Sequence, residues 1–132
     1  FYNVDYEMNA HFADLFETTD THYLLISAMG ANAQSKIFYN KVKGELENHI
    51  HSLNLKYVSI LRPSLLLGER QEQRTLEDMT QKLYQKFSHL VPNTFKYKPV
   101  TAEQVAHTMV DAARTQTDKF EIYDNLRIQT CK

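Results

Sequence analysis

The sequence predicts an α/β fold built on a parallel sheet, and two strands with a helix between them carry this prediction. Residues 23–26 form a continuous apolar run, which is typical of a strand covered on both faces. Residues 57–61 combine aromatic and β-branched side chains, and Pro63 ends that segment because proline donates no backbone hydrogen bond. Residues 34–53, between these runs, follow helical spacing. This order predicts a right-handed parallel crossover.

Three further helices are expected around the sheet. The first covers residues 4–16 and is expected to bury the apolar row Val4, Met8, Phe12, Leu15 and Phe16. In the central helix the expected buried row is Phe38, Val42, Leu46 and Ile50. Another helix begins at Thr75, carries Leu76, Met79, Leu83, Phe87 and Leu90, and stops at Pro92 and Asn93.

The last long helix begins at a capping-box pattern formed by Thr101 and Gln104. Its side chains expected to face inward are Val105, Met109, Val110 and Ala113. After it, apolar residues alternate on both sides of an Asp124-Asn125 turn, which predicts one or two late strand pieces.

Length and composition predict one domain over residues 1–132. With 42% hydrophobic residues the chain can build a core, and a net charge of −1 provides no basic surface for nucleic acid or for a membrane. No apolar run approaches the roughly 20 residues that span a bilayer. The single cysteine, Cys131, excludes an internal disulfide framework. A cytoplasmic location is expected.

The glycines are too few and too dispersed for a phosphate-binding loop. Gly30, Gly44 and Gly68 lie in three different segments, so no glycine-rich motif can be written on this sequence. Because the chain also begins at Phe1, we expect a piece of a larger protein or a processed one. Gly44 lies within the central helix, where ordinary packing is the simplest account and a close backbone approach stays open.

Ser27, Tyr39 and Lys43 form the candidate catalytic site. Tyr39 and Lys43 are four residues apart on a helix, so the ammonium can lie near the phenol and favour its ionised form. Ser27 follows a buried strand, at the sheet edge where α/β proteins bind ligands. The alternative is a Tyr-Lys contact on the helix surface beside a capping serine.

Two other polar groups have weaker interpretations. His49 and His51 diverge on a helix and are poor ligands for one metal, so no metal site is expected. A solvated loop is the favoured interpretation of the segment around Arg70, but this residue follows a strand end and is also a candidate substrate contact.

Several motifs in order resemble one family. They are Val4-Asp5-Tyr6, the strand ending at Ser27 with Met29-Gly30-Ala31, Tyr39 and Lys43 with Gly44-Glu45, Arg62-Pro63, Leu65-Leu66-Leu67 and Glu69-Arg70-Gln71-Glu72. The chain is similar to the atypical short-chain dehydrogenase/reductases, in the branch related to the Tat-interacting oxidoreductase and to nucleoside-diphosphate-sugar epimerase-like proteins. This resemblance covers nearly the whole chain.

The resemblance implies a Rossmann-type parallel sheet with flanking helices, of which this chain is the carboxyl-terminal portion without the amino-terminal glycine-rich βαβ unit. It implies an NAD(P)-dependent oxidoreductase or epimerase-like protein acting on a small carbonyl or alcohol. Tyr39 would be the acid/base, Lys43 would lower its pKa and hold the nicotinamide ribose, and Ser27 would orient the reacting oxygen. The cofactor would be NADP or NAD, with NADP favoured, lying along Pro63, Ser64 and Leu65.

Two departures from the family pattern leave alternatives open. Ala28 stands where many relatives have a second serine, and the phosphate-binding half is absent, so a partner, a second copy of the chain or the protein's own first half is expected to cover the exposed sheet. The main alternative function is a non-catalytic nucleotide-sensing or protein-interaction module on the same fold. A structural remnant without a ligand is the third possibility.

Overall fold

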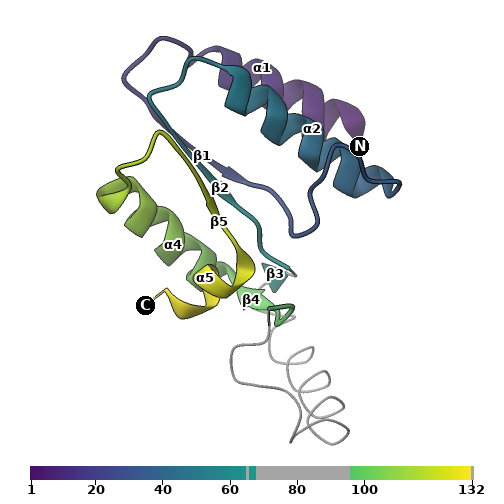
Figure 1. Ribbon diagram of the computed structural model, residues 1–132, viewed down its shortest axis with the longest axis vertical. Coiled ribbons are helices and arrows are strands. Elements are labelled where there is room, and N and C mark those ends of the chain that lie inside the picture. The colour runs from purple at the N-terminus through teal and green to yellow at the C-terminus, as the bar shows by residue number, and fades with distance from the viewer. Residues whose placement is uncertain (65, 68–95, 132) are drawn as a thin grey trace, which may run out of the picture.

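The structure is a computed structural model that describes residues 1–64, 66–67 and 96–131 (Figure 1). Its helices are the π-helix η1 (Asn3–Met8), α1 (Asn9–Asp14), α2 (Phe38–Ser52), α4 (Ala102–Thr115) and α5 (Asn125–Thr130). Its strands are β1 (His22–Ile26), β2 (Tyr57–Leu61), β3 (Leu66–Leu67), β4 (Val100–Thr101) and β5 (Phe120–Tyr123). The helix expected from Thr75, together with Leu65, Gly68 and Arg70, lies outside the described residues.

A three-stranded parallel sheet in the order β1-β2-β5 lies at the centre of the fold. Tyr23 pairs with Val58, and Val58 pairs with Phe120. Helices flank this sheet, with α1 and α2 on one side and α4 and α5 on the other (Figure 1). A second parallel pair, β3 with β4, extends beyond the carboxyl end of β2. The predicted α/β class is confirmed, and the parallel sheet with flanking helices is consistent with part of a Rossmann-like fold.

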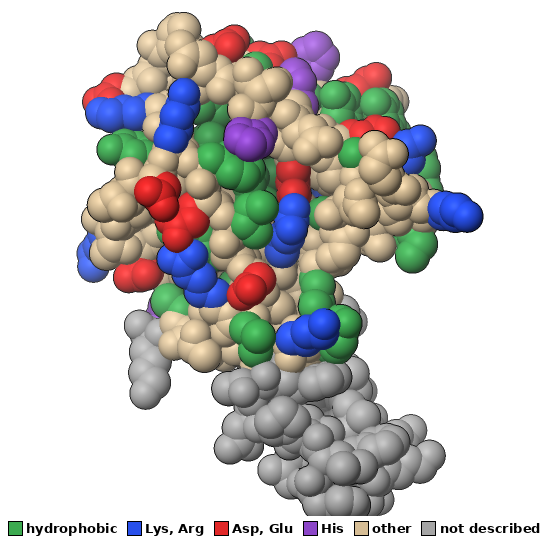
Figure 2. All heavy atoms as spheres, viewed as in Figure 1, with side chains coloured by type: hydrophobic (Ala, Val, Ile, Leu, Met, Phe, Trp, Pro, Cys, Tyr) green, Lys and Arg blue, Asp and Glu red, His purple; other side chains and the backbone are tan. Residues whose placement is uncertain are grey.

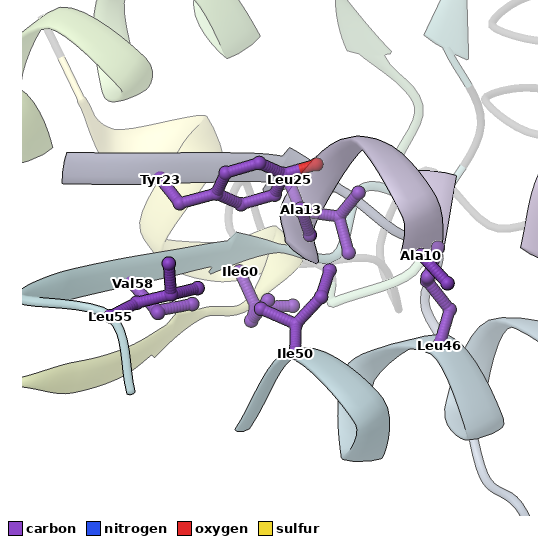
Figure 3. Close-up of a cluster of buried hydrophobic side chains, with 9 residues drawn as sticks. All are labelled: Ala10, Ala13, Tyr23, Leu25, Leu46, Ile50, Leu55, Val58 and Ile60. Carbon is purple, nitrogen blue, oxygen red and sulfur yellow. The ribbon is translucent and has the colours of Figure 1, made fainter. Parts of the chain in front are cut away.

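Side chains alternate between the two faces of the sheet, as strand geometry requires. On one face Tyr23 and Leu25 pack against α1 and α2, where Leu46 and Ile50 point toward the strands (Figure 3). The opposite face is covered by α4 and α5 through a second cluster, which contains Leu61, Val100, Val105, Ala112, Tyr123 and Ile128. Both faces of the sheet are therefore buried, which explains the continuous apolar run of β1.

The first helix buries a different face from the expected one. Ala10 and Ala13 are buried against the sheet, whereas four of the five residues of the expected row are exposed and only Phe16 packs partly buried against the core. The exposed fractions along this row are 60% for Val4, 64% for Met8, 54% for Phe12 and 73% for Leu15. The physical reason is close approach, because a methyl group lets the helix lie nearer to the strands than a large side chain does.

Three smaller expectations change as well. Phe38 begins α2 rather than lying within it and is exposed, although Val42, Leu46 and Ile50 are buried as predicted. In α4, Val110 and Ala113 are exposed, and Thr108 and Ala112 take the inward positions. The late strand expected after Asp124 is helix α5 instead, because the Asp124 side chain accepts a hydrogen bond from the backbone N–H of Arg127 and caps that helix.

Candidate binding site at the carboxyl ends of the strands

Three neighbouring strands end together and remain tied beyond their last residues. The backbone N–H of Ser27 donates to Leu61 at 2.7 Å, and that of Arg62 donates to Tyr123 at 2.9 Å. Just past these bonds a cavity of about 180 Å³ opens at the carboxyl edge of the sheet. Its lining residues are Met29, Gly30, Arg62, Lys96, Asp124, Asn125 and Leu126. This edge is where open parallel sheets bind ligands.

Arg62 is held at the cavity by a buried carboxylate. Its Nε lies 3.0 Å from Oε1 of Glu47, and its Nη2 pairs with Oε2 of the same side chain. Glu47 projects from α2 and is buried, and its hydrogen bonds raise the pKa of the Arg62 guanidinium above its ordinary value. This two-bond geometry fixes the guanidinium plane and keeps the group charged.

Asn125 ties three parts of the chain to the cavity. Its Oδ1 accepts a hydrogen bond from the backbone N–H of Ser64 at 2.9 Å. Its Nδ2 donates to the backbone carbonyls of Lys96 at 2.7 Å and Lys98 at 2.8 Å. The side chain is only 2% exposed, so these bonds are shielded from water. One amide therefore joins the ends of β2 and β5 to the segment that carries Lys96.

The structure brings Tyr39 and Lys43 together but not in the expected electrostatic relation. Lys43 Nζ lies 5.7 Å from the centre of the Tyr39 ring and 3.7 Å from Asp5 Oδ1. Burial and the Asp5 carboxylate raise the pKa of Tyr39, whereas the sequence predicted that Lys43 would lower it. Burial disfavours the ionised phenol, and Asp5, supplied by η1, pairs with the ammonium and adds a negative charge beside the phenol.

Ser27 is buried on the sheet, away from any hydrogen-bonding partner in the described part of the chain. Its Oγ makes no hydrogen bond there, so the residue does not bond to Tyr39 or Lys43. Ser64 uses its hydroxyl to donate to the Lys98 carbonyl at 2.9 Å, and the Pro63 carbonyl accepts from Met29. Pro63 and Ser64 thus hold neighbouring loops in place. The remaining two candidates, Leu65 and Arg70, are outside the described residues.

Sequence reasoning missed Arg62, Glu47, Lys96 and Asn125. Arg62 directly follows β2 and Asn125 lies two residues after the end of β5, but we interpreted the first as a strand terminator and the second as a turn residue. Glu47 carried a usable signal, because it is a charged residue between the apolar positions Leu46 and Ile50 of one helix. Nothing in the sequence pattern indicated that Lys96 would approach the ends of these strands.

The face of the molecule shown in Figure 2 has no dominant sign of charge, because Lys and Arg side chains are interspersed with Asp and Glu. Among the residues that the structure describes, no group of three or more His, Cys, Asp or Glu side chains could hold a metal ion. No helix within this described part is long and apolar enough to cross a membrane.

Curated proteins with similar sequences are named FMP52. The chain is 36% identical over 120 residues to "Protein FMP52-1, mitochondrial" of Scheffersomyces stipitis, which is 90% of this chain and 53% of the relative. It is 36% identical over 117 residues to "Protein FMP52, mitochondrial" of Debaryomyces hansenii, covering 86% of this chain and 50% of the relative. The Candida albicans protein of that name is 35% identical over 118 residues, with 86% and 50% covered. The chain spans about half the length of these relatives, and no family model matches it.

These matches correct the identification made from motifs. The similar proteins carry the FMP52 name, so the assignment to the short-chain dehydrogenase/reductase and epimerase-like branch is overturned. The oxidoreductase activity expected from that assignment is overturned with it. The cytoplasmic location is also wrong, because the relatives are named as mitochondrial proteins. The comparisons thus relate this chain to mitochondrial FMP52 proteins.

Proposed function

We propose that this chain forms one side of a binding site for a nicotinamide dinucleotide, NADP or NAD, in a mitochondrial protein. The observation that carries the proposal is the cavity at the carboxyl ends of three adjacent parallel strands. Two cationic side chains, Arg62 and Lys96, line it. Parallel sheets bind nucleotides at this edge because the loops that leave successive strands diverge there and leave a crevice. The mitochondrial location follows the names of the similar proteins.

Tyr39 and Lys43 are proposed as ligand contacts on the adjoining wall. The loop that contains Gly30 packs directly on the start of α2, because the backbone N–H of Asn32 donates to the Asn40 carbonyl at 2.9 Å. Gly30 has a φ of +88°, and a Cβ there would lie 3.2 Å from Asn40 Nδ2. One face of this loop therefore lines the cavity, and the other supports the turn of α2 that carries Tyr39. Ser27 is buried beneath this loop and is not proposed as a ligand contact.

The cavity holds only part of such a ligand. Its volume of about 180 Å³ is below the roughly 300–1,000 Å³ of complete small-molecule sites. Because the chain spans about half the length of its relatives, we expect the other wall to come from the remainder of a longer protein.

The test is a fluorescence titration with NADPH and NADH, made on this chain and on the longer protein that contains it. We expect saturable binding by the longer protein and weaker or undetectable binding by the chain alone. Lys43→Gln should weaken binding about tenfold, since a hydrogen bond from a charged group is lost. Lys41→Gln, an exposed position on the same helix, is the matched control.

Two results would contradict the proposal. One is the absence of binding of either nucleotide by the longer protein while circular dichroism shows it folded. The other is equal affinity of the Lys43→Gln and Lys41→Gln proteins, which would remove Lys43 from the site. Recovery of the protein in the cytosolic rather than the mitochondrial fraction would separately contradict the proposed location.

A further inference from the structure

We infer that Arg62 and Lys96 form a subsite for an anionic group of the ligand, a phosphate or a carboxylate, and that Asn125 is the residue that positions Lys96. The inference rests on the binding site proposed above and specifies the chemistry of one part of it. Neither Lys96 nor Asn125 belongs to the set of residues that the sequence motifs indicated.

The charges around the cavity support an anion at this position. Three charged side chains line it, and two of them, Arg62 and Lys96, are cations. The third, Asp124, is already used by α5, since its Oδ1 accepts the backbone N–H of Arg127 at 2.9 Å. The ligand's negative group would therefore meet the two cations while the Asp124 carboxylate is directed to the helix that it caps.

The Arg62 guanidinium is suited to this role by its pairing. Glu47 takes up Nε and Nη2. This leaves Nη1 outside the pair, and the guanidinium plane stays fixed before any ligand arrives. A donor held in this way loses little conformational entropy when it binds an anion. Glu47, which projects from α2, is buried and supports the guanidinium from the side away from the solvent.

Lys96 reaches the cavity because Asn125 fixes its backbone. The Asn125 amide donates to the carbonyls of both Lys96 and Lys98, and Ser64 Oγ adds a third bond to this segment at the Lys98 carbonyl. The ammonium of Lys96 lies 4.9 Å from the centre of the Tyr97 ring, which restricts the side chain further. Lys98 is also exposed but does not line the cavity.

This difference between two lysines in one segment gives a matched pair of variants. In the longer protein, binding of inorganic pyrophosphate and of succinate is measured by calorimetry at low and at physiological salt. Lys96→Gln should weaken binding of the preferred anion about fivefold at low salt, and less as salt screens the charge. Lys98→Gln, with the same loss of charge, should bind as the parent does. The stronger of the two anions identifies the ligand group as phosphate or carboxylate.

The role of Asn125 in positioning Lys96 is tested by combining substitutions at the two residues. Asn125→Asp replaces a donating NH₂ by an oxygen that faces two carbonyl groups, so the segment should move and anion binding should weaken. In the Lys96→Gln background the same substitution should have no additional effect on affinity, which a purely structural role would not produce. Because Asn125→Asp can also unfold the protein, the comparison of the two lysine variants decides the subsite by itself.

The outcomes separate this inference from the proposed function. If pyrophosphate or succinate binds in a Lys96-dependent way but neither dinucleotide binds, the subsite stands and the dinucleotide proposal fails. If a dinucleotide binds with the same affinity in the parent, Lys96→Gln and Lys98→Gln proteins, the subsite is wrong and the dinucleotide site remains. Binding of neither anion by the folded protein, or equal weakening by both lysine variants, also overturns the subsite.

Discussion

The two helical layers each cover one face of the sheet, but they do so with different kinds of side chain. On one side α1 approaches the strands through Ala10 and Ala13, while Met8, Phe12 and Leu15 in and beside it are exposed. On the other side α4 buries Val105 and Ala112 and begins with a complete capping box. The sequences of both helices are amphipathic. The comparison teaches that the size of an apolar residue does not by itself decide whether it is buried, since Ala10 and Ala13 are buried where Met8 and Phe12 are exposed.

Within the layer formed by α1 and α2, the substitution Gly44→Ala in α2 is expected to have the largest effect. A Cβ at Gly44 would lie 2.2 Å from the backbone nitrogen of Ala33 and 2.3 Å from the carbonyl carbon of Asn32. We expect the free energy of unfolding to fall by about 3 kcal/mol, because backbone atoms cannot move aside as a side chain does. At an unconstrained helix position the same change adds about 1 kcal/mol of stability.

Urea unfolding followed by circular dichroism measures this effect. Asn48→Ala, at an exposed position of the same helix, is the control and should be neutral or slightly stabilising. A Gly44→Ala protein as stable as the parent would show that α2 and the loop do not meet so closely.

The orientation of the first helix is tested by Ala13→Leu and Met8→Gln. Ala13 is fully buried, so an added isobutyl group should destabilise the fold by about 2 kcal/mol. Met8 is 64% exposed, and its replacement should change stability by less than about 0.5 kcal/mol. Thermal unfolding of both variants measures this difference in stability. If Met8→Gln instead costs as much as Ala13→Leu, the outward apolar row is buried in solution.

The second layer depends on a cap that the first helix lacks. Thr101 Oγ1 accepts the Gln104 backbone N–H at 3.0 Å, and Gln104 Oε1 accepts the Thr101 backbone N–H at 2.9 Å. Thr101→Ala should lower the free energy of unfolding by about 1 kcal/mol, whereas Thr101→Ser keeps the oxygen and most of the stability. Equal urea midpoints for the Ala and Ser proteins would mean that the cap contributes nothing.

The smallest effect concerns pH and a polar network on the α4 side. His22 Nε2 lies 2.6 Å from Ser59 Oγ, and Ser59 and Tyr123 both donate to the Gln116 side chain. Burial lowers the pKa of His22 below 6.5, although its hydrogen bonding toward Gln116 partly opposes this. As pH falls, the His22 imidazole is therefore protonated at a higher pH in the unfolded chain than in the folded one. The associated stability is complete above pH 6.5 and declines as pH falls toward the lowered pKa.

Urea midpoints at pH 7.5 and 5.5 for the parent and His22→Gln proteins test this contribution. The parent should lose more stability between these two pH values, since glutamine keeps a donor but does not titrate. Parallel losses in the two proteins would assign the pH dependence to other groups.

The sequence predicted what local pattern determines. The apolar run of β1, the period of α2 and the capping box of α4 each have a local cause, and each element is present. It did not predict which face of the first helix is buried, because Ala10 and Ala13 give a weak apolar signal. It also failed after Asp124, where Leu126 and Ile128 suit a strand or a short capped helix equally well.

The same limit applies to the candidate site. The proximity of Tyr39 and Lys43 follows from helical spacing and was predictable. Burial of the phenol and the Asp5 carboxylate raise the pKa of Tyr39 instead of lowering it, and Asp5 reaches the pair only through the packing of η1 on α2. The Arg62-Glu47 and Asn125 contacts likewise join segments distant in sequence. Such contacts require the tertiary fold.

The central position of β2 has a consequence for the order of folding. One neighbour precedes it in sequence and the other follows at a much larger separation, since Tyr23 and Phe120 both pair with Val58. The β1-α2-β2 unit can form early from contacts of moderate sequence separation. The β2-β5 ladder must wait until a much longer loop closes, which slows folding. During synthesis, β2 would therefore emerge with one side unpaired and remain so until the segment that forms β5 is made.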